Sequence, residues 1–123
     1  MGSIKSYKDL VVWRRAMDLA EGVNELLRDF PKREEYRMTS QLARASVSIP
    51  ANIAEGFVRG TRKDYGHFIS IARGSAAETE TLLLLSARMS FAPSASIDPL
   101  LSLTEEVARM LNTLRQRLVA AKA

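Results

Sequence analysis

The sequence contains no cysteine and only one histidine, His67, among 123 residues. Disulfides, thiolate zinc sites and thiol nucleophiles are therefore excluded, and one subunit cannot offer several histidines to a metal. Long apolar runs are also missing, since the longest, Leu82 to Leu85, is far shorter than the roughly 20 residues that span a bilayer. No signal-peptide pattern follows the N-terminal methionine. These absences predict a cytoplasmic protein with no cofactor and no membrane partner.

What is present is typical of one globular domain, with 46% hydrophobic and 26% charged residues. Four segments carry apolar residues at intervals of three or four, which is the spacing of one helix face. Short connections between them predict an all-α fold, an antiparallel up-down-up-down four-helix bundle. We expect an N-terminal tail at 1–6 and a bundle at 7–122, with helices at about 7–29, 33–58, 62–89 and 99–121.

Capping residues support these boundaries. Ser6 and Thr61 each precede a helical pattern and have an aspartate three residues later, as in a capping box. Gly60 occupies the position after a helix end that favours glycine. Asp98 and Pro99 form the preferred N-cap and N1 pair, so the last helix is expected to begin there.

Three features inside the helices carry further expectations. Pro50 removes a backbone hydrogen bond within the second helix and predicts a kink there. The small residues from Gly74 to Ala77 suggest a close helix-helix approach in the third helix. The first helix has two apolar stripes, which indicate either a wide core face or a core face beside a subunit interface. One stripe holds Leu10, Trp13, Met17, Ala20 and Leu27, and the other holds Val12, Ala16, Leu19, Val23 and Leu26.

A polar stripe runs along the second helix beside its apolar face. Two interpretations are open for it: a solvated surface with pairs such as Glu55 with Arg59, or a polar network that fixes helix register or joins subunits. The stripe consists of Gln41, Arg44, Ser48, Asn52, Glu55 and Arg59.

The block from Gln41 to Gly56 resembles the signature of the four-helix-bundle proteins encoded in 23S rRNA intervening sequences. Three further pieces match in order. They are Tyr7-Lys8-Asp9-Leu10 with Trp13, Phe30-Pro31 with Glu34 or Glu35 and Tyr36, and Ile71-Ala72-Arg73-Gly74-Ser75 followed by Glu78.

This resemblance implies a homopentameric ring of four-helix bundles without enzymatic activity. It also implies a distant likeness to the accessory variability proteins of diversity-generating retroelements, basic pentamers thought to bind nucleic acid. Within this family pattern, the polar side chains favour a packed contact between the second and third helices or between subunits. The expected participants are Arg44, Ser48, Asn52, Glu55, Ser75 and Glu78.

The formal net charge is +4 and the sequence pI is about 9.8. In an up-down bundle this charge is polarised along the axis. One end, which we call the basic pole, is expected to carry a net charge of +5 from eight cations and three acidic residues. The acidic residues are Asp9, Glu55 and Asp64. The cations are Lys5, Lys8, Arg59, Arg62, Lys63, Arg115, Arg117 and Lys122. The other end has four cations and seven carboxylates, a sum of −3.

The basic pole predicts binding of RNA or DNA through the phosphate backbone. The nucleic-acid-binding candidates are Lys8, Arg59, Arg62, Lys63, Arg115 and Arg117. The alternative is a ring-forming adaptor that docks a protein partner. Glu55, Asp64 and His67 lack an accompanying nucleophile or glycine-rich phosphate loop, so an enzyme is not expected.

Overall fold

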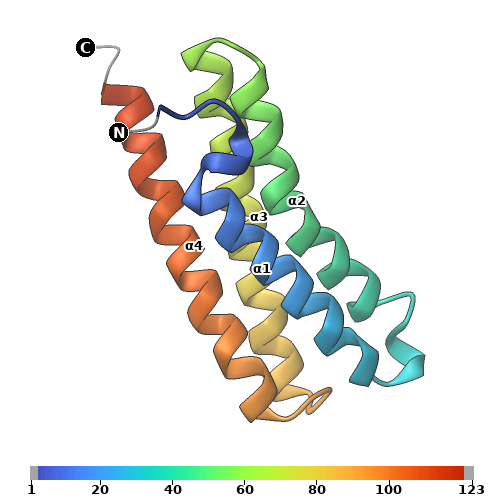
Figure 1. The fold of residues 1–123 in the computed structure, drawn as a ribbon. Helices are drawn as coiled ribbons and strands as arrows, with labels where there is room; N and C mark the ends of the chain where they lie inside the picture. The colour runs from blue at the N-terminus through green and yellow to red at the C-terminus, as the bar shows by residue number, and fades with distance from the viewer. Residues whose placement is uncertain (1–2, 121–123) are drawn as a thin grey trace.

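The computed structural model describes residues 3–120, and this part of the chain is helical without strands. The four main helices are α1 (Val11–Leu26), α2 (Met38–Val58), α3 (Arg62–Arg88) and α4 (Ser94–Ala120). Each helix packs against two others, in the cycle α1, α2, α3, α4 and back to α1. Figure 1 shows the connecting turns at alternating ends of the bundle. The predicted all-α four-helix bundle is confirmed.

The first and second helices are shorter than predicted. Residues Tyr7–Asp9 form a separate 3₁₀ turn, η1, because Leu10 has extended backbone angles (φ −75°, ψ 127°) that interrupt the helix. Two more 3₁₀ turns, η2 (Leu27–Asp29) and η3 (Lys32–Glu34), lie between α1 and α2. The predicted Ser6 capping box is present, but it caps η1 and not α1.

The predicted start of the last helix at Asp98 and Pro99 is wrong. Helix α4 begins at Ser94, and Pro99 lies inside it. The carbonyl of Pro93 accepts hydrogen bonds from the N–H groups of Ser96 (2.9 Å) and Ile97 (3.2 Å), which starts the helix one turn earlier. Ile97 is fully buried, so packing of this turn into the core outweighs the local capping signal.

The remaining helix signals have mixed outcomes. Thr61 caps α3 by accepting a hydrogen bond from the N–H of Asp64 (3.1 Å), and Gly60 adopts a positive φ of 89° after α2, both as predicted. Helix α2 continues through Pro50, so the degree of bending there stays a prediction. No helix within residues 3–120 has the length and apolar character needed to cross a bilayer.

The two stripes on α1 differ in burial. The stripe from Val12 to Leu26 is buried throughout, whereas the other stripe is buried at Ala20 and Leu27, half-buried at Leu10 and Trp13, and 45% exposed at Met17. The centre of the core-facing side is therefore the second stripe, and a subunit interface beside it stays a prediction. The second stripe meets the buried faces of the other three helices, which include Leu42, Ala45, Ile49, Ile53, Ile69, Ala72, Leu83, Val107 and Leu111.

The small residues from Gly74 to Ala77 meet the neighbouring helices only in part. Ser75 and Ala76 are buried, and the hydroxyl of Ser75 lies 2.8 Å from that of Ser48 on α2. Gly74 itself makes no close approach, since a Cβ atom placed on it would meet no heavy atom within 4 Å among the described residues. A tighter approach of α2 to α3 occurs at Gly56, where an added Cβ would lie 2.8 Å from the Cβ of Phe68. The glycine that packing requires is thus at the end of α2.

An ion pair that the sequence pattern did not suggest connects α1 to α4. Arg15 donates two hydrogen bonds to the carboxylate of Glu106, from Nε at 2.8 Å and from Nη2 at 3.1 Å. The hydrogen bond from Arg15 lowers the pKa of the Glu106 carboxyl, and the same contact raises the pKa of Arg15. Bidentate geometry of this kind orders both side chains across the helix interface.

This pair predicts a pH-dependent effect of Glu106→Gln. A carboxyl whose pKa is lower in the folded protein stabilises the fold above its ordinary pKa, and the contribution disappears as the pH falls through the folded-state value. The variant should therefore have a lower free energy of unfolding than the wild type at pH 7, and the difference should shrink in acid. Urea denaturation at a series of pH values measures this.

Glu105→Gln is the matched control, because Glu105 pairs with Arg109 within α4 and both side chains are about two-thirds exposed. Exposed pairs within one helix contribute little. A loss of stability in Glu106→Gln that is equal at all pH values would contradict the predicted role of the charge.

Candidate functional site

One end of the bundle gathers the cationic side chains that the sequence singled out. In Figure 1 the start of the chain, the turn between α2 and α3 and the end of α4 lie at this same end. Arg62 and Lys63 are exposed at the start of α3, and Arg115 is half-buried near the end of α4. Lys8 is exposed in η1, and Lys122 lies outside the described residues. This end corresponds to the basic pole.

Three of these cations line one hollow of about 190 Å³ between the first turns of α3 and the last turns of α4. We call it the basic hollow. The Nε of Arg115 donates a hydrogen bond to the hydroxyl of Ser70 across the two helices, at 2.9 Å. The full lining consists of Arg62, Lys63, Gly66, His67, Ser70, Arg115, Leu118 and Val119.

Arg59 differs from these cations because it already has partners within its own subunit. Its Nε lies 2.9 Å from the carboxylate of Glu55, the i, i+4 pair of a solvated helix face. Its guanidinium also lies over the ring of Phe68, 4.9 Å from the centroid. The positive charge of Arg59 is thus partly compensated, whereas no ion pair within residues 3–120 involves Arg62, Lys63 or Arg115.

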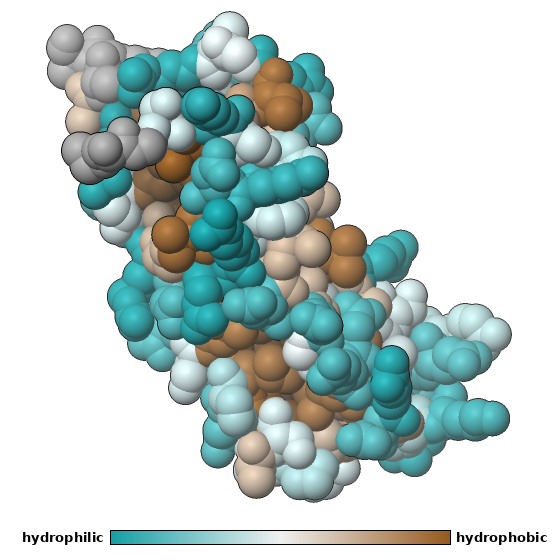
Figure 2. All heavy atoms as spheres, viewed as in Figure 1, coloured by the Kyte–Doolittle hydropathy of each residue, from teal (hydrophilic) through white to brown (hydrophobic). Residues whose placement is uncertain are grey.

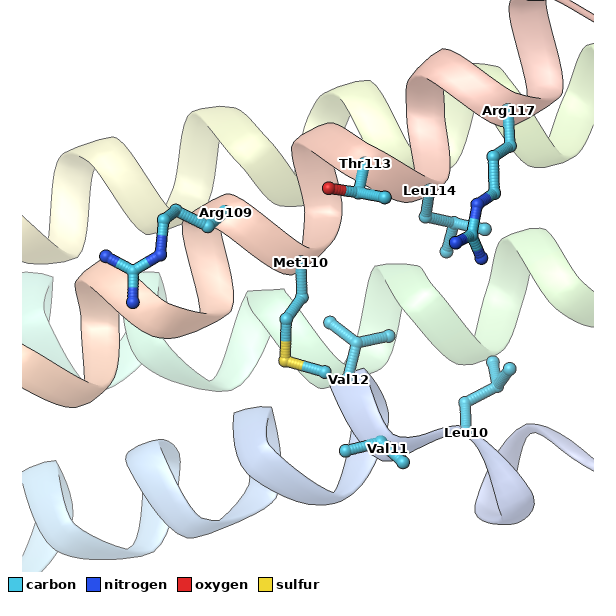
Figure 3. A pocket seen from close by; sticks show the side chains of 8 residues that line it. All are labelled: Leu10, Val11, Val12, Arg109, Met110, Thr113, Leu114 and Arg117. Atoms are coloured by element: carbon cyan, nitrogen blue, oxygen red, sulfur yellow. The ribbon is translucent and has the colours of Figure 1, made fainter.

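Arg117 does not line the basic hollow. It lies at one end of a separate apolar groove of about 530 Å³ between α1 and α4, and Arg109 lies at the other end (Figure 3). The Met110 side chain extends across this groove from α4 toward Val12. The surrounding surface in Figure 2 carries separate hydrophobic patches among hydrophilic side chains. Of the six predicted cations, three therefore line the basic hollow and Arg117 lines the groove, whereas Lys8 and Arg59 line neither.

The polar stripe on α2 contains a hydrogen-bonded core. The hydroxyl groups of Ser48 and Ser75 lie 2.8 Å apart and join α2 to α3. The side-chain amide of Asn52 donates to the carbonyl of Ser48 (2.8 Å) and to its hydroxyl (2.9 Å). This arrangement satisfies polar groups at the α2–α3 interface and opposes sliding of one helix along the other.

The other three residues of the expected polar network stand apart from these bonds. Arg44 and Glu78 line a hollow of about 290 Å³ next to Ser48 and Ser75, without an ion pair to each other. Glu55 pairs with Arg59 at the far end of α2. Each interpretation therefore describes one part of the stripe. Its middle forms a hydrogen-bonded network between α2 and α3, and its end is a solvated ion pair.

One buried acidic residue was missed from the sequence. The side chain of Glu34 in η3 is only 6% exposed, and Arg33 and Arg37 approach its carboxylate to 4.0 Å and 3.9 Å. Glu34 belongs to the motif Phe30-Pro31 with Glu34 or Glu35, so the family resemblance was an available signal. The spacing of apolar residues gave no signal for Glu34, because this residue lies in a connecting turn.

The titratable side chains near these sites, other than the cations, are few and lie apart from one another. Within residues 3–120 no group of three or more His, Asp or Glu side chains is arranged to hold a metal ion. His67 is exposed and packs edge-on against Phe68, with ring centroids 5.3 Å apart. Burial raises the pKa of the Tyr65 hydroxyl above its ordinary value.

The chain is similar in sequence to one protein family and in fold to a solved structure. The model of the 23S rRNA-intervening sequence protein family matches residues 8–113. A similar solved structure is a protein of unknown function from the S23 ribosomal protein family of Bacteroides thetaiotaomicron VPI-5482. It has a TM-score of 0.80 and 25% sequence identity, over 85% of this chain and 98% of that one. No curated protein matches the chain.

Proposed function

Because this chain belongs to the 23S rRNA-intervening sequence protein family, we propose that it is a non-enzymatic bundle that binds the phosphate backbone of RNA or DNA through its basic pole. The observation that carries the proposal is the gathering, at one end, of cations that form no ion pair within residues 3–120. Arg62, Lys63 and Arg115 come from two helices and share one hollow. The opposite end has an acidic excess, so attraction for a polyanion is directional.

The position of two of these cations argues against a purely structural role. The N-terminal end of a helix carries partial positive charge, so cations are unfavourable there and acidic residues are favourable. Arg62 and Lys63 are nevertheless the first two residues of α3. A ligand of opposite charge compensates this local repulsion. Arg115 and Arg117, near the C-terminal end of α4, have no such conflict.

The recognition we propose is independent of base sequence. Sequence-specific recognition of single strands stacks splayed bases on aromatic or guanidinium planes and hydrogen-bonds their edges. The basic hollow is lined by aliphatic, cationic and small polar side chains together with His67, whose ring already packs against Phe68. Phosphate contacts position a nucleic acid without reading its sequence.

A salt titration tests this proposal. Filter binding of a labelled structured RNA should show the logarithm of the association constant falling linearly with the logarithm of salt concentration, because bound cations release counterions from the backbone. A labelled DNA duplex of the same length is the comparison that separates RNA from DNA preference. For six phosphate contacts, the affinity should fall about 10³-fold between 50 and 200 mM salt. An affinity that does not change over this range would contradict backbone binding.

We further propose that the bundle assembles as a homo-oligomeric ring, with five subunits as the family resemblance implies. Support comes from apolar side chains on the outer surface, among them Val11 (59% exposed), Val58 (63%) and Met89 (56%). Single exposed apolar side chains are common, but a contiguous apolar surface such as the groove between α1 and α4, which Val11 lines, is typical of association sites. A ring with its subunits parallel would join their basic poles into one face.

Light scattering of the purified protein measures this assembly. The expected mass is five times that of the 13.7 kDa chain. A single species with the mass of one chain, unchanged across a hundredfold range of protein concentration, would refute the ring.

The second candidate function is an adaptor that docks a protein partner. The observation in its favour is the apolar groove between α1 and α4, where Val11, Met110 and Leu114 meet between two arginines. Pull-down experiments with the wild type and with Met110→Glu distinguish this function from backbone binding. A partner lost on Met110→Glu, with RNA affinity unchanged, would favour the adaptor.

A further inference from the structure

The basic hollow has features of a defined subsite beyond those of a generally positive surface. Its cations come from the first turn of α3 and from the next-to-last turn of α4, so they approach the same space from two helices. None of the three forms an ion pair within residues 3–120. Among the described residues, no carboxylate lines the hollow. The charged side chains that line it are therefore all positive.

Arg115 is positioned before any ligand arrives. Ser70 accepts a hydrogen bond from its Nε at 2.9 Å, which leaves the two terminal nitrogens of the guanidinium to other acceptors. The side chain is half-buried between α3 and α4, so less of its rotamer freedom remains to be lost on binding. A guanidinium held in this way matches the geometry of two phosphate oxygens.

The dimensions of the hollow limit what it can hold. At about 190 Å³ it is smaller than the roughly 300–1,000 Å³ of pockets that enclose a whole small-molecule ligand. A single tetrahedral oxyanion fits such a space, with the remainder of its molecule outside. His67 and Ser70 add neutral hydrogen-bonding groups to the lining.

We propose that the basic hollow is a discrete subsite for one phosphate group of a nucleic-acid backbone, with Arg115 as its central ligand and Arg62 and Lys63 beside it. Ser70 is a positioning residue that orients Arg115. This inference deepens the proposed function and rests on it for the source of the phosphate. It adds that one phosphate per subunit occupies a fixed place, whereas the other cations of the pole contribute only general attraction.

The single histidine of the chain provides a direct readout. His67 lines the hollow, so its imidazole signals in a proton NMR spectrum report on occupancy without overlap from another histidine. Inorganic phosphate added at constant pH should shift these signals along a saturating curve. Sodium chloride added to the same ionic strength is the control, and it should cause only a small, non-saturating change.

Two arginine variants separate the subsite from the general charge. Arg115→Gln should weaken phosphate binding about tenfold, because hydrogen bonds to charged groups are worth more than neutral ones. Arg109→Gln removes the same charge from the same helix, outside the hollow, and should leave the phosphate titration unchanged. Ser70→Ala should weaken phosphate binding less than Arg115→Gln. Thermal unfolding of each variant confirms that it is folded before titration.

The outcomes distinguish this inference from the proposed function. Saturation that is equal in Arg115→Gln and the wild type, or absent in both, overturns the subsite. If RNA binds and its affinity falls equally in the two arginine variants, the subsite is again overturned while the proposed function stands. Saturable phosphate binding that depends on Arg115, in a protein with no affinity for RNA or DNA, supports a phosphate subsite but refutes a nucleic-acid backbone as its source.

Discussion

Gly56→Ala is expected to destabilise the bundle, although alanine is normally the better helix former. Within a helix this substitution ordinarily stabilises by about 1 kcal/mol. At position 56 the new methyl group would lie 2.8 Å from the Cβ of Phe68 and 3.3 Å from the carbonyl oxygen of Tyr65. The carbonyl oxygen belongs to the α3 backbone and the Cβ is bonded to it, so the clash is relieved only if the two helices move apart. Overpacking of this kind costs about 1–3 kcal/mol and outweighs the gain in propensity.

The measurement is urea denaturation of Gly56→Ala beside Gly74→Ala, at one protein concentration. Gly74 lies in the interior of α3, where an added methyl group would meet no heavy atom of the described residues within 4 Å. That substitution should stabilise by about 1 kcal/mol, since only helix propensity acts there. The two variants carry the same chemical change with opposite expected signs. A stabilised Gly56→Ala protein would show that α2 and α3 are not in close contact at this point.

The double reversal Arg62→Glu with Lys63→Glu is expected to lower the affinity for RNA about 100-fold at fixed salt. We expect each of the two residues to contribute one charged hydrogen bond to phosphate, and each bond to raise the affinity about tenfold. The fold should tolerate the change, because acidic residues in the first turn of a helix interact favourably with its positive end. Reduced binding in a variant of equal or higher stability therefore reports on the interface. Filter binding and urea denaturation measure the two properties.

Lys32→Glu with Arg88→Glu is the matched control at the opposite pole. Both residues are exposed, and the reversal changes the net charge by the same amount. This control should retain most of the affinity, with a modest loss from the change in total charge. Equal losses in the two double variants would mean that binding follows net charge alone, and the assignment of the interface to the basic pole would fail.

Local features of the chain were predictable where local interactions decide the outcome. The cap at Thr61 and the positive φ at Gly60 depend on a few neighbouring residues, and both were recognised. The start of α4 was misplaced because the capping signal at Asp98 and Pro99 competes with burial of Ile97, and periodicity does not rank these two effects. The interruption at Leu10 was also missed, because the apolar spacing continues through a residue whose backbone is extended.

The candidate site was predictable in part. Cations near helix ends could be assigned to one pole, because the order of four alternating helices implies which ends meet. Their division between the basic hollow and the α1–α4 groove could not be inferred, since Arg115 and Arg117 are only two positions apart in the chain. Two positions along a helix correspond to opposite sides of it. A small difference in the rotation of a helix about its axis therefore places a side chain on another surface.

The order of residues along the chain was sufficient for the fold class, the number of helices and the family. These properties depend on apolar spacing and motifs that are local in sequence. Contacts between distant segments decided the rest: the core face of α1, the requirement for glycine at Gly56, the bond from Arg115 to Ser70 and the pair of Arg15 with Glu106. Each depends on the rotation and separation of neighbouring helices. Close packing sets both quantities from all side chains together, so no single stretch of sequence contains them.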